Sequence, residues 1–407
     1  MLKVDLTINT KYNICEHLKI INKIYLGMRK ERPYQICTKT VMDTSDSRIK
    51  FDEHGVCDHA TNFYNKVQPK ISNFKLREKE LEKFINNIKE KGKNNEYDCL
   101  LGLSGGLDSS YMLHLAVREY GLRPLVFHTD CGWNTDLAVN NIKVLIEKLN
   151  LDLFTDVVNW EQMKDLQLAY FKSGLPNIDI PQDMAYTAAL YKYAMKFKLK
   201  TILNGYNLTT EGVRNPLEYF YYGTDPIHFK FIAKKFSNVK FDKLNFSSIY
   251  RHKIYLRYFR GLKVLKPLSY INFNKKEAIN LLVREYTWKP YPQKHFESRF
   301  TRFYEGYWLP KRFGFDTRRV VLSSLILANQ ITREEALLEL EKPALDEITI
   351  KNEFDYVARK LDITSDELKK YFNLPKKFYW DYPNQYQFLN IGAKILNIFG
   401  SEISIKR

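Results

Sequence analysis

The stretch "LSGGLDSSY", from Leu103 to Tyr111, decides the fold. It places two glycines and three serines around one aspartate, directly after the apolar run "DCLLGL" of residues 98–103. Glycines permit a tight turn and let backbone N–H groups approach a ligand, and a helix start offers unpaired N–H donors with a partial positive charge. A buried strand that ends here, followed by a helix that begins near Ser109, therefore predicts an anion cradle between the two elements.

Apolar runs alternate with helical patterns over the next hundred residues. The runs occupy residues 97–104, 122–130, 151–158 and 200–207, and the segments between them have the helical periodicity and the length of about 10 to 15 residues that βαβ units require. This alternation predicts an α/β fold, in which a parallel sheet carries helices on both faces. Ligands bind beyond the carboxyl ends of the strands in such sheets, so functional residues are expected just after each strand.

The side chains of the loop suit a phosphate ligand. Asp108 could hold a magnesium ion that bridges phosphate oxygens, and hydroxyl donors are available from Ser104, Ser109 and Ser110. Two better-known phosphate motifs are excluded, because Gly106 is followed by leucine instead of lysine and the dinucleotide spacing G-x-G-x-x-G is absent.

The pattern S-G-G-x-D-S-S after a strand resembles the pyrophosphate loop of the ATP pyrophosphatases, which have an adenine nucleotide alpha hydrolase-like fold. The resemblance implies ATP and Mg²⁺ as cofactors, adenylation of a carbonyl-type oxygen and release of pyrophosphate. It implies a nucleotide site formed by Leu103, Ser104, Gly105, Gly106, Asp108, Ser109, Ser110, Phe127, His128, Asp130 and, in a G-x-N-x-x-x-E element, Gly205, Asn207, Thr210 and Glu211. The expected catalytic residues are Asp108, Ser104 and Ser109, with Asp108 as the magnesium ligand and Lys266 as a further phosphate contact.

A length of 407 residues suggests two or three structural units, since a domain typically has roughly 100 to 200 residues. We expect a small loop-rich N-terminal unit over residues 1–70, the nucleotide-binding domain over 71–270, and a mainly helical region over 271–407 that binds the acceptor or a partner. Residues 75–91 predict a helix that leads into the first strand. Capping boxes predict two further helix starts, at Thr332–Glu335 and at Thr364–Glu367.

The sequence contains no apolar run of about 18 residues and no signal-peptide pattern, so we expect a cytoplasmic, soluble protein with no membrane partner. The cysteines are odd in number and scattered, which argues against a disulfide framework; they are Cys15, Cys37, Cys57, Cys99 and Cys131.

The net charge of +17 would suit a nucleic-acid partner, because lysine and arginine neutralise phosphates. The basic residues are spread over the whole length, however, so direct nucleic-acid binding is not expected.

Two segments outside the nucleotide loop carry a more specific resemblance. The stretch "CTKTVMDTSDSRIKFDEHGVCDHA" of residues 37–60 and the stretch from Lys294 to Leu340 resemble the N-acetyl sugar amidotransferases of bacterial surface-polysaccharide and flagellar-glycan pathways. The resemblance covers residues 35 to 340, and no counterpart is expected for the tail after Leu340. It implies that ATP activates the acetamido oxygen of a nucleotide-linked N-acetyl sugar, and that ammonia then displaces AMP to leave an acetamidino group.

Basic residues are abundant in the Lys294–Leu340 segment. As a group they are expected to grip the diphosphate of the nucleotide-linked sugar. Asp183, in "IPQDMA", is either an ordinary helix cap or a site residue. The predicted acceptor-binding set is Asp183, Lys294, His295, Arg299, Arg302, Lys311 and Arg318, with Arg312 and Arg319 as further candidates.

The source of ammonia is expected to lie outside this chain. A glutaminase needs an activated cysteine, but position 2 is Leu2, and Cys131 lies in "TDCGW", which is no nucleophile elbow. The resemblance likewise implies a separate glutaminase subunit that works with a cyclase-like partner.

Members of the resembled family commonly carry two C-x-x-C pairs, a spacing that suits tetrahedral zinc. Here Thr40 and Ala60 stand at the second position of each pair. Cys37 and Cys57 remain, with Asp58 and His59 nearby, and two thiolates plus one imidazole could still hold a metal, but we expect a metal-free packed remnant.

Two rival interpretations use the same loop. A tRNA-modifying pyrophosphatase of the thiolation type would explain the basic charge, although such enzymes often have reactive cysteines near the site. A non-catalytic binding subunit would have no need of Asp108 together with all three serines.

Overall fold

The computed structural model describes residues 32–240 and 251–398 of the chain. Its centre is a five-stranded sheet, in which every strand pairs in parallel with its neighbours in the order β3-β2-β1-β4-β5. The strands are β1 (Cys99–Gly102), β2 (Pro124–Asp130), β3 (Leu153–Val157), β4 (Thr201–Leu203) and β5 (Lys263–Leu265). The chain runs outward from β1 to β3 and then returns to β4, so the strand order switches between β1 and β4, which is where ligands bind in such sheets.

Alternate residues of the strands are buried on opposite faces of the sheet. Leu101 and Val126 belong to one hydrophobic core, which is covered by α4 (Phe74–Gly92), α5 (Leu107–His114), α6 (Asp136–Leu149) and α11 (Lys275–Tyr286). Leu100 and Phe127 belong to another core, which is covered mainly by α8 (Ile180–Lys196). The predicted fold class, a parallel sheet with helices on both faces, is therefore confirmed.

The predicted helix at residues 75–91 is α4. It buries Leu81, Ile85 and Ile88 against the sheet side of the molecule, whereas Leu76 and Phe84 are exposed. Helix α5 continues into a π-helical turn, η1 (Leu115–Glu119), before β2 begins.

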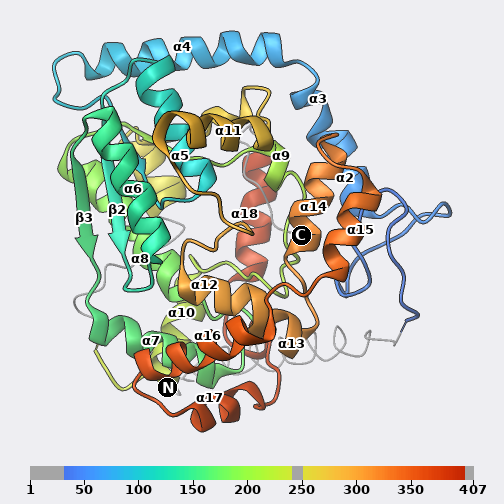
Figure 1. The fold of residues 1–407 in the computed structure, drawn as a ribbon. Helices are drawn as coiled ribbons and strands as arrows, with labels where there is room; N and C mark the ends of the chain where they lie inside the picture. Colours follow the sequence, from blue (N-terminus) through green and yellow to red (C-terminus); the bar gives the residue numbers. More distant parts are fainter. Residues whose placement is uncertain (1–31, 241–250, 399–407) are drawn as a thin grey trace, which may run out of the picture.

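The strands point toward a helical region built largely from the C-terminal part of the chain (Figure 1). Both predicted capping boxes are confirmed, because the Thr332 and Thr364 hydroxyls accept the backbone N–H groups of Glu335 and Glu367 at the starts of α15 and α17. The helices here are α12 (Arg299–Phe303), η4 (Tyr304–Trp308), α13 (Leu309–Phe313), α14 (Arg318–Leu327), α15 (Arg333–Glu341), α16 (Glu347–Lys360), α17 (Ser365–Phe372), η5 (Tyr379–Asp381) and α18 (Tyr386–Ile398).

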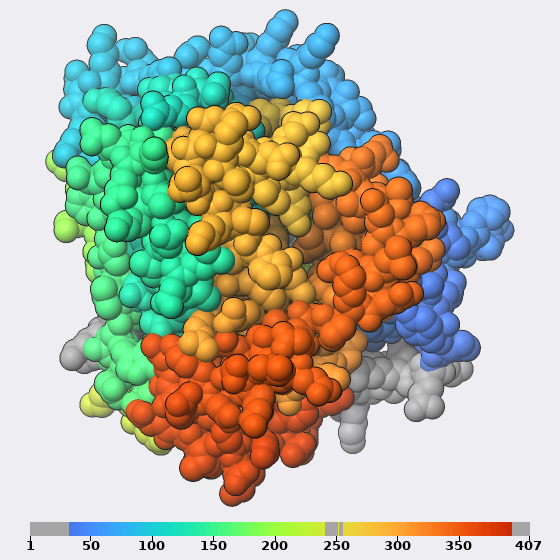
Figure 2. Space-filling model, viewed as in Figure 1, coloured from blue at the N-terminus to red at the C-terminus, as the bar shows by residue number. Residues whose placement is uncertain are grey.

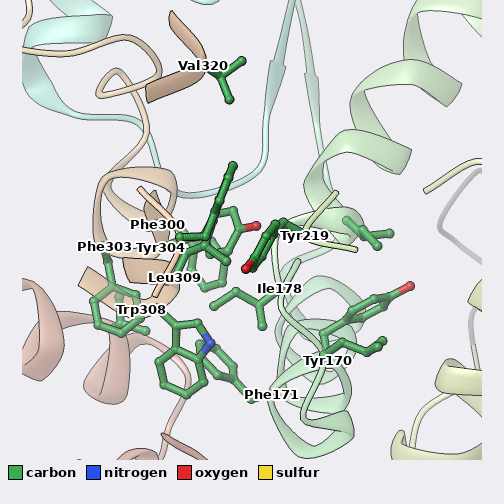
Figure 3. Packing of buried hydrophobic residues seen from close by; sticks show 14 of the residues in the cluster. Tyr170, Phe171, Ile178, Tyr219, Phe300, Phe303, Tyr304, Trp308, Leu309 and Val320 are labelled. Atoms are coloured by element: carbon green, nitrogen blue, oxygen red, sulfur yellow. The ribbon is translucent and has the colours of Figure 1, made fainter. Parts of the chain in front are cut away.

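A large aromatic core joins this region to the strand ends. Phe171, from α7 (Trp160–Ser173), packs edge-on against Trp308 with ring centroids 4.7 Å apart, and Phe300 packs beside them. Figure 3 shows the rings of α7 meeting those of α12 and η4. Figure 2 shows the surface of the same view, where the segment after β5, in gold, lies between the green N-terminal half of the sheet domain and the orange C-terminal helices. The C-terminal helices and the sheet are thus held in one packed body.

The N-terminal part has little regular structure beyond two helices, α2 (Asp58–Lys66) and α3 (Gln68–Ile71). It packs on α14 and α15: the Val41 amide donates to Ser323 Oγ at 3.2 Å, and the Arg333 guanidinium donates to the carbonyl of Cys37 at 3.1 Å. The other elements are α9 (Leu208–Glu211), α10 (Pro226–Phe236), η2 (Arg251–Phe259) and η3 (Pro267–Ser269). Among the described helices, none combines the length and the apolar character needed to cross a bilayer.

Candidate active site

The loop between β1 and α5 requires glycine at position 105. Gly105 has φ +81°, and a Cβ there would lie 2.7 Å from the carbonyl oxygen of Ala138. A side chain at this position would therefore be strained and would push the loop away from α6. A Cβ on Gly106 would lie 2.7 Å from Oε1 of Glu297, so a side chain there would displace that carboxylate.

The serine hydroxyls shape the loop from within. Ser104 Oγ lies 3.1 Å from Ser109 Oγ and accepts the N–H of Gly106 at 3.2 Å. Ser109 Oγ in turn accepts the N–H of Ser104 at 3.2 Å. The loop is also held by Trp288, whose indole N–H donates to the carbonyl of Gly105 at 3.1 Å. The cradle is thus preorganised before any ligand arrives.

Asp108 lies at the start of α5, within a set of charged and polar groups from three segments of the chain. Its Oδ1 accepts from the amide of Asn207 at 3.1 Å, and its Oδ2 lies 2.8 Å from Lys294 Nζ. Lys294 Nζ also lies 2.6 Å from Glu211 Oε1 and donates to Thr210 Oγ1 at 3.3 Å. A single ammonium therefore bridges the two carboxylates, Asp108 and Glu211.

The loop after β4 positions these groups. Asn207 is fully buried and caps α9, where its Oδ1 accepts the N–H of Thr210 at 2.7 Å. Gly205 lies so close to α5 that a Cβ would meet the carbonyl carbon of Asp108 at 2.8 Å. The ends of β1 and β4 therefore meet across the point where the strand order switches.

Two cavities open at this edge of the sheet. The smaller, of about 470 Å³, is lined by Gly106, Asp108, Ser109, Gly205, Thr210, Glu211 and Lys266, among others. The larger, of about 690 Å³, extends over the end of β2 toward α8, α12 and η4. The two share a wall, because both are lined by Ser104, Tyr186, Lys275, Gln293, Lys294, His295, Glu297 and Val321.

Of the other predicted nucleotide-binding residues, some line a cavity and others do not. Leu103 and His128 line the larger cavity. The Phe127 ring is fully buried, Asp130 Oδ1 accepts the N–H of Gly132 at 2.8 Å, and Ser110 is buried in α5; these three line neither cavity. Phe127 contributes main chain near the site, because its carbonyl accepts the N–H of Leu103 at 2.8 Å.

The predicted acceptor-binding residues divide in a similar way. Asp183, Lys294, His295 and Arg318 line the larger cavity. Arg318 is held by Asp316, with Nη2 2.7 Å from Oδ2.

The remaining basic candidates lie outside the lining of both cavities. Arg299 and Arg302 of α12 both pair with the buried Glu353 of α16. Arg312 donates to the carbonyl of Tyr371 at 2.8 Å, and Lys311 is exposed on α13. Arg319 pairs with Asp43 at 3.1 Å. The guanidiniums of Arg299 and Arg302 thus fix α12 to α16.

Sequence reasoning missed Glu297 and Lys275. Ser104 Oγ donates to Glu297 Oε1 at 3.2 Å, and the Glu297 carbonyl accepts the N–H of Thr135 at 3.0 Å, which holds this segment over the strand ends. Lys275 begins α11 after the Asn274 cap. Glu297 is one of several carboxylates in a segment that was read only for its positive charge, and Lys275 looked like a solvated lysine at a helix start.

The two shared lysines differ in their electrostatics. Burial lowers the pKa of Lys294, but the carboxylates of Asp108 and Glu211 outweigh it and raise the pKa above its usual value. Burial lowers the pKa of Lys275, and the charge of Lys294 lowers it further, while the charge of Asp108 offsets part of this effect. Lys294 therefore remains a cation, whereas Lys275 releases its proton more readily than an ordinary lysine.

The four cysteines that the structure describes offer no activated nucleophile at the cavities. Burial, followed by the charge of Asp179, raises the pKa of the Cys131 thiol, which lines the larger cavity. The thiol therefore stays protonated and unreactive. Leu2 and Cys15 lie outside the described residues.

Cys37 and Cys57 lie together in the N-terminal part. The N–H of Cys57 donates to Cys37 Sγ at 3.2 Å, and the hydroxyl of Thr40 lies 3.6 Å from Cys57 Sγ. His59 is turned to Asp46, with Nε2 2.7 Å from Oδ2. Among residues 32–240 and 251–398 no three histidine, cysteine or acidic side chains form a metal-binding group, so these donors do not fit a zinc ion.

Residues 297–396 match the family described as "LPS biosynthesis protein WbpG-like, C-terminal domain". The match confirms, over these residues, the predicted resemblance to surface-polysaccharide biosynthesis proteins. It continues well past Leu340, so the expectation that the tail has no counterpart is wrong. No curated protein sequence matches the chain.

Solved structures with a similar chain path include three synthetases. The NH3-dependent NAD synthetase of Campylobacter jejuni subsp. jejuni is 16% identical, with 74% of this chain and 99% of that chain covered and a TM-score of 0.28. The NAD+ synthetase of Burkholderia pseudomallei is 15% identical, with 78% and 98% covered and a TM-score of 0.30. The NMN synthetase of Francisella tularensis is 16% identical, with 55% and 99% covered and a TM-score of 0.27.

Proposed function

We propose that this chain is an ATP-dependent amidotransferase that converts the acetamido group of a nucleotide-linked N-acetyl sugar to an acetamidino group, with AMP and pyrophosphate as the other products. The observation that carries the proposal is the shared wall between a phosphate-type cradle and a second, larger cavity. The match of residues 297–396 to a lipopolysaccharide biosynthesis domain supports a sugar of bacterial surface glycans as the acceptor, in an O-antigen or flagellin-glycan pathway.

ATP phosphates suit the smaller cavity. Gly106, Asp108 and Ser109 line it at the start of α5, where a helix N-terminus favours an anion, and Lys266 and Lys294 supply positive charge. The carboxylates of Asp108 and Glu211 fit a magnesium ion, since both already hold one cation, the Lys294 ammonium, between them. Such an ion would neutralise charge on the leaving pyrophosphate.

The acceptor suits the larger cavity. Its lining includes the side-chain amides of Asn134, Asn177 and Asn215 together with the rings of Trp133 and Phe220. Amides that bond hydroxyl groups and rings that cover apolar faces are what an N-acetyl sugar requires. Arg318 lies at the same cavity and suits the diphosphate of the nucleotide carrier.

The reacting atoms would meet at the shared wall. The acetamido oxygen attacks the α-phosphorus of ATP, the bond to the bridging oxygen breaks, and pyrophosphate leaves with the electron pair. An amide oxygen is a weak nucleophile, so most of the acceleration must come from alignment and from stabilised leaving-group charge. Ser104, Lys275 and Glu297 lie on this wall and are the groups that would orient the acceptor there.

Ammonia would come from a separate glutaminase subunit with a cyclase-like partner. The protonated thiol of Cys131 supports this view, because the described residues of the larger cavity then include no thiolate that could attack glutamine.

The test is pyrophosphate release from ATP with magnesium and ammonium chloride, in the presence of a panel of nucleotide-linked N-acetyl sugars or of bulk tRNA. Mass spectrometry of each acceptor accompanies the assay. AMP formation together with conversion of a sugar acetamido group to acetamidino is the expected result. Turnover that depends on tRNA alone would replace the proposal with the RNA-modifying alternative.

A further inference from the structure

A short segment lies across the cradle between β1 and α5. It comprises residues 293–298, which we call the strap, and it is anchored on two sides. The side-chain amide of Gln293 donates to the carbonyl of Ala344, between α15 and α16, at 2.8 Å. The carbonyl of Glu297 accepts from the N–H and from the hydroxyl of Thr135, the N-cap of α6, at 3.0 Å and 3.1 Å. The strap is therefore fixed to the helices on both sides of the cradle.

The strap places one cation between the two carboxylates of the smaller cavity. Lys294 Nζ lies 2.8 Å from Asp108 Oδ2 and 2.6 Å from Glu211 Oε1, and it donates to Thr210 Oγ1 at 3.3 Å. The ammonium neutralises the charge that a divalent cation would neutralise there. Asp108 and Glu211 can therefore coordinate a metal ion only after the side chain of Lys294 has withdrawn.

The strap also places one anion against the glycine–serine loop. Ser104 Oγ donates to Glu297 Oε1 at 3.2 Å. The carboxylate lies beside Gly106, the N-cap residue of α5, because a Cβ built there would be 2.7 Å from Oε1, 3.0 Å from Cδ and 3.2 Å from Oε2. A serine hydroxyl and a helix N-terminus are partners that a phosphate oxygen also uses. Glu297 thus lies where the loop would bind an anionic ligand.

Lys294 and Glu297 together present the two kinds of charge that a metal-bound polyphosphate carries. Both side chains line both cavities. The anchor at Thr135 uses the main-chain carbonyl of Glu297, so the carboxylate can leave Ser104 while that anchor stays in place. A withdrawn Lys294 likewise remains in the lining of the smaller cavity, where its charge is free to meet phosphates. Opening the cradle therefore requires movement of two side chains and leaves the fold intact.

We propose that Lys294 and Glu297 inhibit the ATP site from within, by occupying the places of the divalent cation and of a phosphate until both side chains are displaced. The inference rests on the proposed function, because it takes ATP as the ligand of the smaller cavity, and it adds how access to that cavity is regulated. Only molecules in which both side chains have withdrawn bind the nucleotide, so the apparent affinity is reduced by the fraction of such molecules.

Calorimetric titration with the α,β-methylene analogue of ATP in magnesium chloride tests the anion half without turnover. Glu297→Gln keeps the side-chain volume and removes the charge. We expect it to bind the analogue about tenfold more tightly than the wild type, because a charge-assisted hydrogen bond no longer has to be broken. Glu334→Gln, on the exposed side of α15, removes the same charge elsewhere and should match the wild type. Unchanged or weaker binding by Glu297→Gln would overturn the inference.

Two comparisons separate displacement from general repulsion between like charges. Glu297→Asp keeps the charge but withdraws the carboxylate from Ser104 by one methylene, so it should bind the analogue nearly as tightly as Glu297→Gln; an affinity equal to that of the wild type would show repulsion alone and count against the inference. Inorganic pyrophosphate should repeat the gain seen with the analogue, whereas adenosine, which has no phosphate, should bind the wild type and Glu297→Gln equally. The same gain with adenosine would mean that the variant merely widens the cavity, which also contradicts the inference.

Magnesium chloride alone is the probe for the cation half. Lys294→Met should bind magnesium about tenfold more tightly than the wild type, because no ammonium competes for Asp108 and Glu211, and Lys276→Met, on the exposed side of α11, should match the wild type. Equal affinities in all three proteins would refute this half of the inference. If no sugar supports pyrophosphate release, the amidotransferase function fails, while these binding comparisons still decide whether the strap closes the site.

Discussion

Replacing Lys294 by methionine tests whether its ammonium occupies the place of the divalent cation in the ligand-free protein. Lys294 Nζ lies 2.8 Å from Asp108 Oδ2 and 2.6 Å from Glu211 Oε1. Methionine fills a similar volume without charge, so the variant leaves two carboxylates facing each other with no cation between them.

The loss of stability follows from the exposure of the three side chains. They are 21%, 19% and 34% exposed, which lies between exposed pairs, worth about 0 to 1 kcal/mol, and buried pairs, where removal of one partner costs about 3 to 5 kcal/mol. We therefore expect a loss of about 2 kcal/mol in EDTA, which for a chain of 407 residues lowers the unfolding temperature by about 2 °C.

Scanning calorimetry in EDTA and in magnesium chloride is the assay. Magnesium should restore most of the stability of Lys294→Met and should affect the wild type less, because the wild-type ammonium competes for the same carboxylates. Pyrophosphate release should fall about 100-fold to 1000-fold, as expected when a preorganised positive group is lost. Lys276→Met, on the exposed side of α11, is the control and should match the wild type.

A variant as stable as the wild type in EDTA would refute the electrostatic reasoning. A loss that magnesium does not repair would show that Asp108 and Glu211 do not form a cation site.

Three further predictions concern other parts of the site. Gly205→Ala should reduce ATP turnover about 100-fold or more in the pyrophosphate assay, because its Cβ would meet the backbone of Asp108 at 2.8 Å, whereas Gly392→Ala, with open space at its Cβ, should keep full turnover. The pKa of Asp179 is raised to about 7 in the folded protein but is about 4 in the unfolded chain. Its protonated carboxyl therefore contributes stability that is present at acidic pH and is lost as the pH rises through about 7. The unfolding midpoint, measured from about pH 5 to about pH 8.5, should fall more in the wild type than in Asp179→Asn. Cys131→Ala should keep ammonium-dependent turnover within about twofold, and a large loss measured with ammonium chloride would mean that this thiol takes part in the reaction.

The fold could be predicted from the sequence because its signals are local. Four of the five strands were visible as apolar runs, and the glycine–serine loop marks the switch between β1 and β4. The fifth strand, β5, has only three residues and is mostly exposed, so it left no comparable pattern.

The site was harder to predict where it depends on partners from distant segments. Arg299 looked like a ligand for phosphate, yet it is bound to Glu353, 54 residues away. Glu297 is placed beside Ser104 by the docking of its segment on Thr135, 162 residues away. Which charge meets which is decided by tertiary packing, and one sequence does not reveal it.

The shared wall has a consequence for recombining such proteins. The wall residues Gln293 to Glu297 are continuous in the chain with α12, the first of the C-terminal helices. A chimaera joined after Leu309 would keep residues 293–297 of the parent and replace the helices that follow them. A chimaera joined before Pro290 would replace residues 293–297 as well, while it keeps the parent's loop between β1 and α5. Under the proposed function, acceptor selection and ATP use would depend on the same wall residues, and exchanging one region alone should disturb both.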